Sequence, residues 1–423
     1  MTEVHLGHRF GDVLVTVLDV DGQPLSDREV TVEQRAHDFS FGNIGFELIA
    51  LASGESDEAA GLADLWLDVF NTATLPFYWG PFEPQRGRPD TERLHRAAKW
   101  FVDRGCRVKG HPLLWHTLTA DWLREASTDE VEAAVRARIR REVADFADVV
   151  DAWDAINEAV IMPVFANERQ RNAITRLAWE RGRIATVRLA FDEARAADPA
   201  ATLLINDFDL STAYECLIEG VLAAGIRVDA IGLQTHMHQG YWGEEKTLAI
   251  LDRFARFGLP IHLTETSLVS GTVMPPEIED LNDYQPESWP STPAGEQRQA
   301  DEIVRHYRLL LSHPCVQAIT YWGLSDDGAW LGAPSGLVRA DGTPKPAYDA
   351  LRALLKQEWW LAPTKLRTDD AGRVHIRGFL GDYLLQHADH TASVAVSAPG
   401  MSRTRARLRP RSEHGHQAAA TWR

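Results

Sequence analysis

Eight short apolar segments alternate with amphipathic helical stretches through most of this chain, and this alternation is the feature that most constrains its fold. Each segment has the length and composition of a buried β-strand. The eight segments are residues 39–43, 72–78, 107–111, 152–157, 202–206, 229–234, 261–264 and 318–322. The helical stretches between them include residues 91–104, 129–146, 181–197 and 296–311. The pattern predicts a parallel sheet whose strands are connected by crossover helices.

Eight strand and helix units favour a closed (β/α)8 TIM barrel over an open doubly wound sheet. We assign this barrel to residues 39–356 of the 423-residue chain. Two flanking segments remain, residues 1–38 and residues 357–423, and neither has the alternating strand and helix pattern.

Both flanking segments have the alternating pattern of β-strands. Apolar residues alternate along residues 13–17 and again from Val30, and Asp21-Gly22 between them is typical of a tight turn, so we expect a β-hairpin. After a last helix at residues 348–356, strands are predicted at 374–379, 383–385 and 393–396. We expect these strands to join the N-terminal hairpin in one small β module, and we expect the tail at 403–423 to be partly mobile.

Polar and aromatic residues gather where the predicted barrel strands end. In a TIM barrel the carboxyl ends of the strands carry the active site. The residues at these positions are His111, Trp115, His116, Asn157, Glu158, Asn206, Gln234, His236, Glu265, Trp322 and Trp330. Packing alone does not explain a strand that stays apolar and then presents a polar side chain at its exit.

Glu158 and Glu265 are the two carboxylates that follow buried strands in this set. They are 107 residues apart (265 − 158), which fits three barrel units. Cleavage of a glycosidic bond uses two carboxyl groups, of which one protonates the departing oxygen and, in retaining enzymes, the other attacks the anomeric carbon. We therefore predict that Glu158 and Glu265 face each other across a sugar. The alternative is that both are ordinary surface acids.

The composition excludes several partners. The net charge is −17, which argues against nucleic acid or an anionic membrane surface, because both need a basic face. Fourteen Trp residues suit a carbohydrate substrate, since flat rings stack on sugar faces. The three Cys residues form no disulfide framework. We expect no cofactor, and the oligomeric state stays open. The N-terminus has no secretory signal pattern, so we expect a cytoplasmic protein or a secreted one with its signal removed.

Five segments, in order, are similar to glycoside hydrolase family 10, the family of endo-β-1,4-xylanases. They are GHPLLWH at 110–116, WDAINEA at 153–159, GLQTH at 232–236, LTE at 263–265 and YWG at 321–323, the last followed by Asp326 and Trp330. The resemblance spans about residues 39–356. It implies a (β/α)8 barrel, a retaining mechanism and a xylan or xylo-oligosaccharide substrate.

The resemblance also implies roles for individual residues. Glu158 would be the acid/base and Glu265 the nucleophile. The expected substrate-binding residues are His111, Trp115, Asn157, Gln234, His236, Trp322 and Trp330, together with Tyr78 and Trp79 at the end of the second strand. Asn157 would hold the sugar 2-hydroxyl, and His236 would hydrogen-bond to the nucleophile.

Two departures from the family pattern bear on the substrate. The family usually has a Glu-Asn-x-x-Lys-Trp run after strand two, and this chain has Thr74, Leu75 and Tyr78 at the three polar positions. Losing these anchors should weaken binding of xylan's second sugar. Ser267 stands where the family often has an Asp two residues after the nucleophile.

Four alternatives stay open. The same chemistry could act on a non-xylan glycoside, such as a short oligosaccharide or a glycosylated plant metabolite. The protein could be a non-catalytic carbohydrate-binding protein. His236 and His238 form a His-x-His pair that could bind a metal, although no third ligand is evident and we assign no metal site. The Pro-rich residues 269–295 should be non-helical and form either a binding loop or a packed surface loop.

Overall fold

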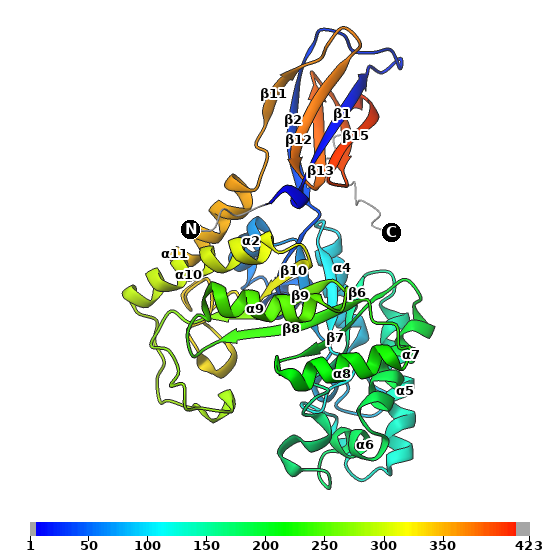
Figure 1. The fold of residues 1–423 in the computed structure, drawn as a ribbon, viewed down its shortest axis with the longest axis vertical. Coiled ribbons are helices and arrows are strands. Elements are labelled where there is room, and N and C mark those ends of the chain that lie inside the picture. Colours follow the sequence, from blue (N-terminus) through cyan, green and yellow to red (C-terminus); the bar gives the residue numbers. More distant parts are fainter. Residues whose placement is uncertain (1–5, 412–423) are drawn as a thin grey trace. The chain divides into compact units, whose positions relative to one another are not determined.

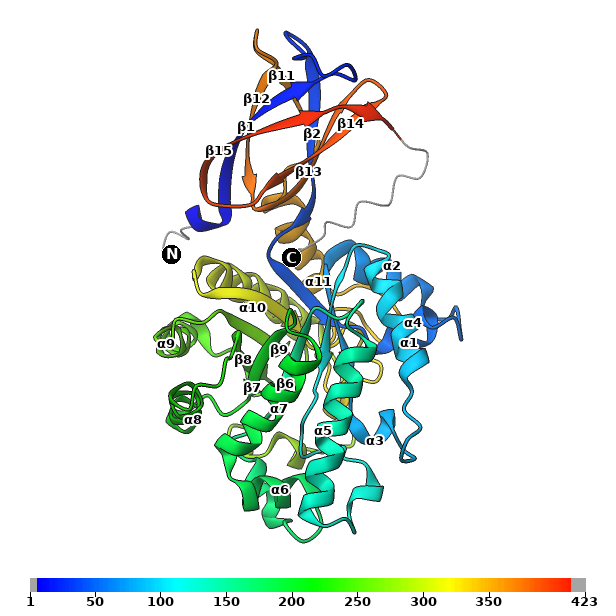
Figure 2. The ribbon, with the colours of Figure 1, turned by 90° about the vertical axis from the view of Figure 1, so that its right-hand side faces the viewer.

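The computed structural model describes residues 6–411 (Figures 1 and 2). The chain divides into two compact units. One unit consists of Phe41–Gln299 and Cys315–Lys345, and the other contains the two ends of the chain together with Ala300–Pro314. Within the described residues, no helix is both long and apolar enough to cross a bilayer.

Eight strands form a closed barrel, as the sequence predicts, in the order β10-β3-β4-β5-β6-β7-β8-β9. The strands are β3 (Ser40–Ile44), β4 (Thr72–Pro76), β5 (Arg107–His111), β6 (Ala152–Asn157), β7 (Thr202–Asp207), β8 (Ala230–Met237), β9 (Ile261–Leu268) and β10 (Val316–Tyr321). Neighbouring strands pair in parallel from β3 through β10. All the strands therefore run the same way, and their carboxyl ends lie at one rim of the ring.

Helices cover the outside of the strands (Figure 1). They include α1 (Ile49–Ala52), α2 (Ala60–Val69), α3 (Trp79–Phe82), α4 (Thr91–Val102), α5 (Thr128–Asp145), α6 (Ala173–Arg181), α7 (Arg183–Ala197), α8 (Thr212–Ala223) and α9 (Gly243–Ala255). The start of α5 shows why these sequences are helical. Ser127 and Glu130 form a capping box there, which satisfies backbone N–H groups that the first turn leaves open.

The predicted N-terminal hairpin is wrong. β1 (Phe10–Leu18) and β2 (Glu29–His37) lie in different sheets. β1 pairs antiparallel with β12 (Arg373–Phe379) and parallel with β15 (Gly400–Arg407), whereas β2 pairs antiparallel with β11 (Thr364–Arg367) and β13 (Gly381–His387). Asp21-Gly22 does form a turn, but the chain then crosses from one sheet to the other, because the valines of both strands face one shared core.

The two ends of the chain form one β-sandwich, which confirms that they join in a small β module. Its core contains Val15, Val32, Ile376, Leu385 and Val396, contributed by both sheets. β14 (His390–Val396) and the two-residue β16 (Arg409–Pro410) complete the larger sheet. The tail at 403–423 is expected to be partly mobile. Within it, residues 403–407 lie in β15 and residues 409–410 form β16, and residues 412–423 lie outside the described part. The domain boundaries near residues 39 and 356 stay a prediction.

Residues 269–295 pack around a small apolar cluster that they share with Ala333. Val269, Met274, Trp289 and Ala333 form this cluster. The segment contains a 3-10 turn, Leu281–Asp283, and its last residues begin helix α10 (Pro293–Ser312), so the expectation that it is entirely non-helical is wrong at those points. Proline is compatible with the first position of a helix, because the N–H that it lacks has no intrahelical acceptor there.

Candidate active site

The candidate catalytic residues lie at one rim of the barrel. Asn157 ends β6 and Glu158 follows it, Gln234 lies in β8, and Glu265 lies in β9. Asn206 lies in β7, the strand between β6 and β8. Adjacent parallel strands thus bring side chains that are far apart in sequence to the same end of the ring.

Three side-chain amides connect the two glutamates. Asn157 Nδ2 donates to Glu158 Oε1 (3.2 Å), and Asn206 Nδ2 donates to Glu265 Oε1 (3.0 Å). Asn157 Oδ1 accepts from Asn206 Nδ2 (2.8 Å) and from Gln234 Nε2 (3.1 Å). Gln234 Nε2 also reaches Glu158 Oε1 at 3.3 Å. The structure therefore brings Asn157, Gln234, Glu158 and Glu265 into one hydrogen-bonded network.

Asn206 is the central residue of this network, and its own position is tightly fixed. Thr264 Oγ1 donates to Asn206 Oδ1 at 2.6 Å, which leaves the amide N–H groups facing Asn157 and Glu265. A Cβ atom at position 232 would lie 2.3 Å from Asn206 Oδ1. Gly232 is therefore required for this close approach between β7 and β8.

Glu158 occupies an environment that favours its protonated form. Its backbone has φ +57°, a left-handed conformation that is strained for a residue other than glycine and is often found at functional sites. Burial, together with the negative charge of Glu265, raises the pKa of Glu158 to about 7. Hydrogen bonds from Trp115 Nε1 (2.8 Å), Gln234 and Asn157 oppose this rise in pKa. Glu158 can thus hold a proton near neutral pH and release it when its surroundings change.

Glu265 is held from its other side by His236. The imidazole Nε2 lies 3.1 Å from Glu265 Oε2, and Nδ1 lies 3.0 Å from Ser267 Oγ. A serine hydroxyl can donate to Nδ1, which leaves the proton of a neutral imidazole on Nε2, where it can be donated to Glu265. With Ser267 as partner, His236 can therefore orient the carboxylate without carrying a charge.

His111 is anchored by a buried ion pair. His111 Nδ1 and Lys109 Nζ both lie 2.7 Å from Asp154 Oδ2, below the barrel rim. Burial raises the pKa of Asp154, but the attraction of Lys109 and the contact with His111 outweigh burial and hold it at about 2. The carboxylate therefore stays ionised and fixes the orientation of the His111 ring.

An aromatic wall lines one side of the site, and it consists of Phe46, Tyr78, His111, Trp115 and Trp322. The Tyr78 ring lies 5.5 Å from Trp115 and 5.7 Å from His111, measured between ring centroids. Phe46 lies 5.9 Å from Tyr78 and 5.7 Å from Trp322. Burial raises the pKa of the Tyr78 hydroxyl, and the negative charges of Glu265 and Glu158 raise it further. The effect of these charges indicates that Tyr78 lies near both carboxylates.

Trp79 does not join the aromatic wall, although it neighbours Tyr78 in sequence. Its ring is buried against Trp122 and the Arg138 guanidinium, and its Nε1 donates to Glu83 Oε2 at 3.1 Å. Consecutive residues at the strand exit thus point in different directions, with one ring in the site and the other in the packing behind it.

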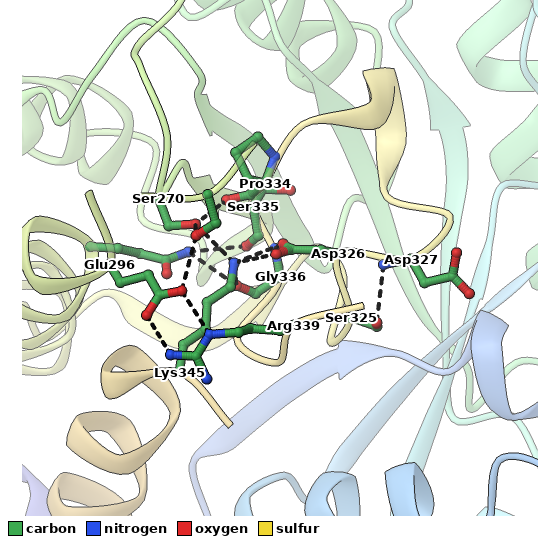
Figure 3. Close-up of polar contacts among 12 residues, drawn as sticks. Ser270, Glu296, Ser325, Asp326, Asp327, Pro334, Ser335, Gly336, Arg339 and Lys345 are labelled. Carbon is green, nitrogen blue, oxygen red and sulfur yellow. Dashed lines mark hydrogen bonds and ion pairs between the residues drawn. The ribbon is translucent and has the colours of Figure 1, made fainter. Parts of the chain in front are cut away.

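Trp330 covers His236 from a loop that leaves β10. Its ring centroid lies 4.7 Å from His236 and 5.2 Å from His238. Figure 3 shows the polar cluster that holds both ends of this loop. Lys345 Nζ, which is fully buried, donates to Asp326 Oδ1 (2.7 Å), Ser270 Oγ (2.8 Å) and Gly336 O (2.9 Å). The position of Trp330 therefore depends on a buried lysine 15 residues further along the chain (345 − 330).

Glu296 and Arg339 extend this cluster (Figure 3). Arg339 Nε and Nη2 donate to the two carboxylate oxygens of Glu296 at 2.8 and 2.5 Å. Ser291 Oγ donates to Glu296 Oε1 at 3.1 Å and contacts Ser270 Oγ at 2.7 Å. The start of α10, the exit of β9 and the Trp330 loop are thus connected through one set of polar side chains.

Two buried residues beside Glu158 were not assigned a role from the sequence. His116 is fully buried, its Nε2 lies 3.8 Å from Glu158 Oε2, and burial lowers its pKa to about 3. Asp207 accepts from the backbone N–H of Val160 at 3.0 Å, and burial, with the charge of Glu158, raises its pKa to about 8. The sequence places both residues near the ends of predicted strands, but it gives no signal for their depth or for the packing of His116 against Phe165, whose ring centroid lies 4.3 Å away.

The His-x-His pair acquires no third ligand in the described part of the chain. No group of three or more His, Cys, Asp or Glu side chains there is arranged to hold a metal ion. His238 instead packs between aromatic rings, 5.2 Å from Trp330 and 6.1 Å from Trp289, and burial lowers its pKa to about 3.

Comparison with known proteins agrees with this architecture. The endo-1,4-beta-xylanase B of Thermotoga neapolitana is 26% identical over 334 residues, which cover 73% of this chain and 89% of that protein. The anti-sigma-I factor RsgI6 of Acetivibrio thermocellus is 25% identical over 398 residues, which cover 92% of this chain but only 45% of that protein. The solved structure of a GH10 protein from Paenibacillus barcinonensis has the same fold, with a TM-score of 0.62 and 24% identity over 76% of this chain and 96% of that one.

The match to a family decides the class. Residues 52–354 match the family described as Glycosyl hydrolase family 10, and this range includes Glu158, Glu265 and the three amides that connect them. The chain is a glycoside hydrolase and belongs to glycosyl hydrolase family 10.

Proposed function

We propose that this protein is a retaining β-glycosidase in which Glu158 is the acid/base and Glu265 the nucleophile. The observation that carries the proposal is that Asn157, Asn206 and Gln234 connect the carboxyl groups of the two glutamates. Of these two groups, Glu158 has its pKa raised to about 7. Double displacement at a glycosidic bond requires one carboxyl group that holds a proton and a second that attacks the anomeric carbon.

In the first step, an oxygen of Glu265 attacks the anomeric carbon and the proton of Glu158 passes to the glycosidic oxygen. The bond between the anomeric carbon and the leaving group breaks, and a glycosyl ester forms on Glu265. This ester removes the negative charge of Glu265, which is one of the causes that raise the pKa of Glu158. The pKa of Glu158 consequently falls, so that its carboxylate is ionised and available at the moment when it must accept a proton.

In the second step, a water molecule attacks the anomeric carbon and transfers a proton to Glu158. The ester bond breaks, so that the sugar leaves with its original anomeric configuration and Glu265 is again a carboxylate. Asn206 Nδ2 and His236 Nε2 lie at 3.0 and 3.1 Å from the two oxygens of Glu265. Both groups can donate to the carboxylate as its charge returns, which stabilises the departing nucleophile.

The proposed substrate is xylan or a xylo-oligosaccharide. This choice is supported by membership of glycosyl hydrolase family 10 and by relatives that are named endo-1,4-beta-xylanase and beta-1,4-xylanase. Aromatic faces such as Trp322 and Trp330 suit stacking on sugar rings.

A second candidate, the same chemistry on a non-xylan glycoside, is favoured by one specific observation. Thr74 and Leu75, which stand at two of the three missing polar anchors, are fully buried and available to no sugar. At the third position Tyr78 places an aromatic ring against Trp115 and His111. This side of the site therefore has apolar surface where xylan's second sugar needs hydrogen bonds, which favours a short glycone.

The catalytic proposal is tested with two variants and two aryl glycosides. Glu265→Ala should lower kcat by at least about a thousandfold on both substrates, because it removes the nucleophile. Glu158→Ala should impair a glycoside with a poor leaving group far more than an activated one, since only the poor leaving group needs the proton. A 2-fluoro-glycoside inactivator should label Glu265, as found by mass spectrometry of peptides. Equal losses for Glu158→Ala on both glycosides, or a label elsewhere, would contradict the assignment.

Product analysis distinguishes the two substrate candidates. Xylohexaose and a panel of aryl glycosides of different single sugars are incubated with the protein and with its Glu265→Ala variant as the inactive control. Release of xylobiose and xylotriose supports a xylan-degrading enzyme. Faster turnover of a single-sugar glycoside, with xylohexaose left intact, supports the second candidate. No turnover of any glycoside would leave a non-catalytic binding protein.

A further inference from the structure

The smaller sheet of the β-sandwich has an outer face dominated by cationic side chains. In this sheet β1 lies between β12 and β15. Val13, Val15 and Val17 of β1 point into the core, so Asp12, Leu14 and Thr16 point outward. Residues in register on neighbouring strands share a face. The outward residues on the flanking strands are Arg373, His375 and Arg377 of β12, and Met401, Arg403, Arg405 and Arg407 of β15.

Register turns these residues into rows across the sheet. Leu14 lies between His375 and Arg403, Thr16 lies between Arg373 and Arg405, and Asp12 lies between Arg377 and Met401. Neighbouring strands are about 4.8 Å apart, and outward residues along one strand are roughly 6.6 Å apart. We call this set of rows the arginine face.

Three arginines of the arginine face are exposed and have no acidic partner within the described residues. These are Arg377, Arg403 and Arg405. Elsewhere on the face, Asp369 pairs with Arg373 at 2.8 Å, and Asp12 pairs with His375 at 2.9 Å. Exposed arginines without a partner keep their donors available for a ligand.

The outer face of the larger sheet is different, although the same chain ends build it. There Lys365 pairs with Glu29 at 2.8 Å, Arg367 with Asp27 at 2.7 Å, and Arg35 with Glu33 at 2.7 Å. On the larger sheet these cationic side chains each pair with an acidic side chain, whereas the arginine face has more cationic side chains than acidic ones. The overall composition does not explain the surplus of cationic side chains on the arginine face, because the chain as a whole carries a net charge of −17.

We propose that the arginine face binds an acidic polysaccharide, a polymer of sugars that bear uronic carboxylates. The guanidinium group donates two parallel hydrogen bonds to a carboxylate, which makes arginine suited to this ligand. Leu14 and Met401, the latter 67% exposed, offer apolar contact to the C–H faces of the sugar rings beside the charges. The choice of a polysaccharide among polyanions rests on the proposed function, because the substrate proposed there, xylan, is itself a polysaccharide.

Nucleic acid and anionic membranes fit this face less well. Double-stranded DNA carries one charge per about 1.7 Å of its axis, so a chain of net charge −17 repels it over most of its surface. A uronate polymer carries at most one carboxylate on each sugar ring, so its charges are spaced more widely than those of DNA and the chain repels it less. Three unpaired arginines on a flat sheet correspond better to such separated carboxylates.

The test measures binding of the full chain, carrying Glu265→Ala to prevent hydrolysis, to polygalacturonate, to glucuronate-substituted xylan and to neutral arabinoxylan. The variant Arg377→Gln/Arg403→Gln/Arg405→Gln should bind the two acidic polymers roughly tenfold more weakly, because three exposed ionic contacts are lost. The matched control, Arg35→Gln/Lys365→Gln/Arg367→Gln, removes the same charge from the larger sheet and should bind as the parent does. Raising the salt concentration should weaken binding of the acidic polymers by the parent towards the level of the Arg377→Gln/Arg403→Gln/Arg405→Gln variant.

Four outcomes overturn the proposal. They are equal binding by the triple variant and the parent, equal loss in the matched control, binding to arabinoxylan as tight as to the acidic polymers, and tighter binding to duplex DNA or to phosphatidylserine vesicles. Hydrolysis of a small aryl glycoside by the triple variant without Glu265→Ala is measured in parallel and should not change. This separates the two proposals, since absent hydrolysis with intact polymer binding contradicts the proposed function alone.

Discussion

Glu158 is poised between two sets of opposing influences. Burial and the charge of Glu265 raise its pKa, and hydrogen bonds from Trp115, Gln234 and Asn157 lower it. The balance, a pKa of about 7, is above the ordinary value of 4.5. The folded protein therefore binds a proton here that the unfolded chain releases above about pH 4.5. This contribution to stability is present in acid and is lost as the pH rises through 7.

Trp115→Phe should shift the alkaline limit of activity upward. The indole Nε1 donates to Glu158 Oε2 at 2.8 Å and stabilises the ionised form. A hydrogen bond to a charged group contributes about 1.5–3 kcal/mol, and one pKa unit corresponds to about 1.4 kcal/mol, so we expect a shift of roughly one to two units. The measurement is the pH dependence of kcat/KM on an aryl glycoside with a poor leaving group, which reports the free enzyme.

Trp322→Phe is the matched control for this shift. Trp322 also belongs to the aromatic wall, at 5.3 Å from His111, but its ring does not donate to Glu158. It should change KM and leave the alkaline limit where it is. An unchanged alkaline limit in Trp115→Phe would mean that the indole does not stabilise the ionised form of Glu158.

The loop that carries Trp330 is an element held by one buried ion pair. Lys345 connects Asp326 at its start with Gly336 at its end, and the backbone N–H of Gly336 donates to Asp326 Oδ1 at 2.9 Å. Burial lowers the pKa of Lys345 and raises that of Asp326, so both charges depend on each other's presence. The loop also contains Leu331 at φ +63°, a strained conformation that needs such support.

Lys345→Met should lower the free energy of unfolding of the barrel by up to about 3 kcal/mol, because Asp326, whose side chain is 14% exposed, is then left without its charged partner. The double variant Lys345→Met/Asp326→Leu should recover much of this loss, since it removes both charges. Lys99→Met is the control, because its ion pair with Asp103 is exposed and contributes at most about 1 kcal/mol. Denaturant unfolding followed by Trp fluorescence measures all three, and additive losses in the double variant would refute the coupling.

Most of the barrel strands could be predicted because strands that are buried on both faces form nearly continuous apolar runs. Residues 152–157 and 107–111 match β6 and β5 in full. The partners of β1 could not be predicted from alternation, because alternating valines show which face is buried and not which strand lies beside it. β15 was missed since its outward positions are arginines and only Ala406 among its residues is buried.

The same contrast applies to the candidate site. Glu158 and Glu265 follow apolar runs, so their place at the rim could be predicted. The bridging role of Asn206 depends on a close approach at Gly232 that only three-dimensional packing reveals. Tyr78 and Trp79 are adjacent aromatic residues with no sequence signal for their different directions, and only Tyr78 lies in the aromatic wall.

At the scale of the whole molecule, the β-sandwich makes the two ends of the chain depend on each other. β1 lies between β12 and β15, which are more than 350 residues away along the chain (373 − 18 = 355). The valines of β1 and residues such as Ile376 and Val394 share one core. A change near the N-terminus should therefore affect the C-terminal strands before it affects sequence neighbours in the barrel.

Val15→Ala should open the C-terminal strands to proteolysis. Val15 is fully buried opposite Val374, and deletion of two methyl groups with the cavity that remains costs about 2 kcal/mol. The open population should rise roughly thirtyfold, and tryptic cleavage after Arg373 and Arg377 should rise with it. Thr16→Ala, on the outward face of the same strand, is the control and should leave cleavage unchanged. Mass spectrometry of the early fragments decides the matter: cleavage that rises equally within residues 41–299 would show that the sandwich does not open as its own unit.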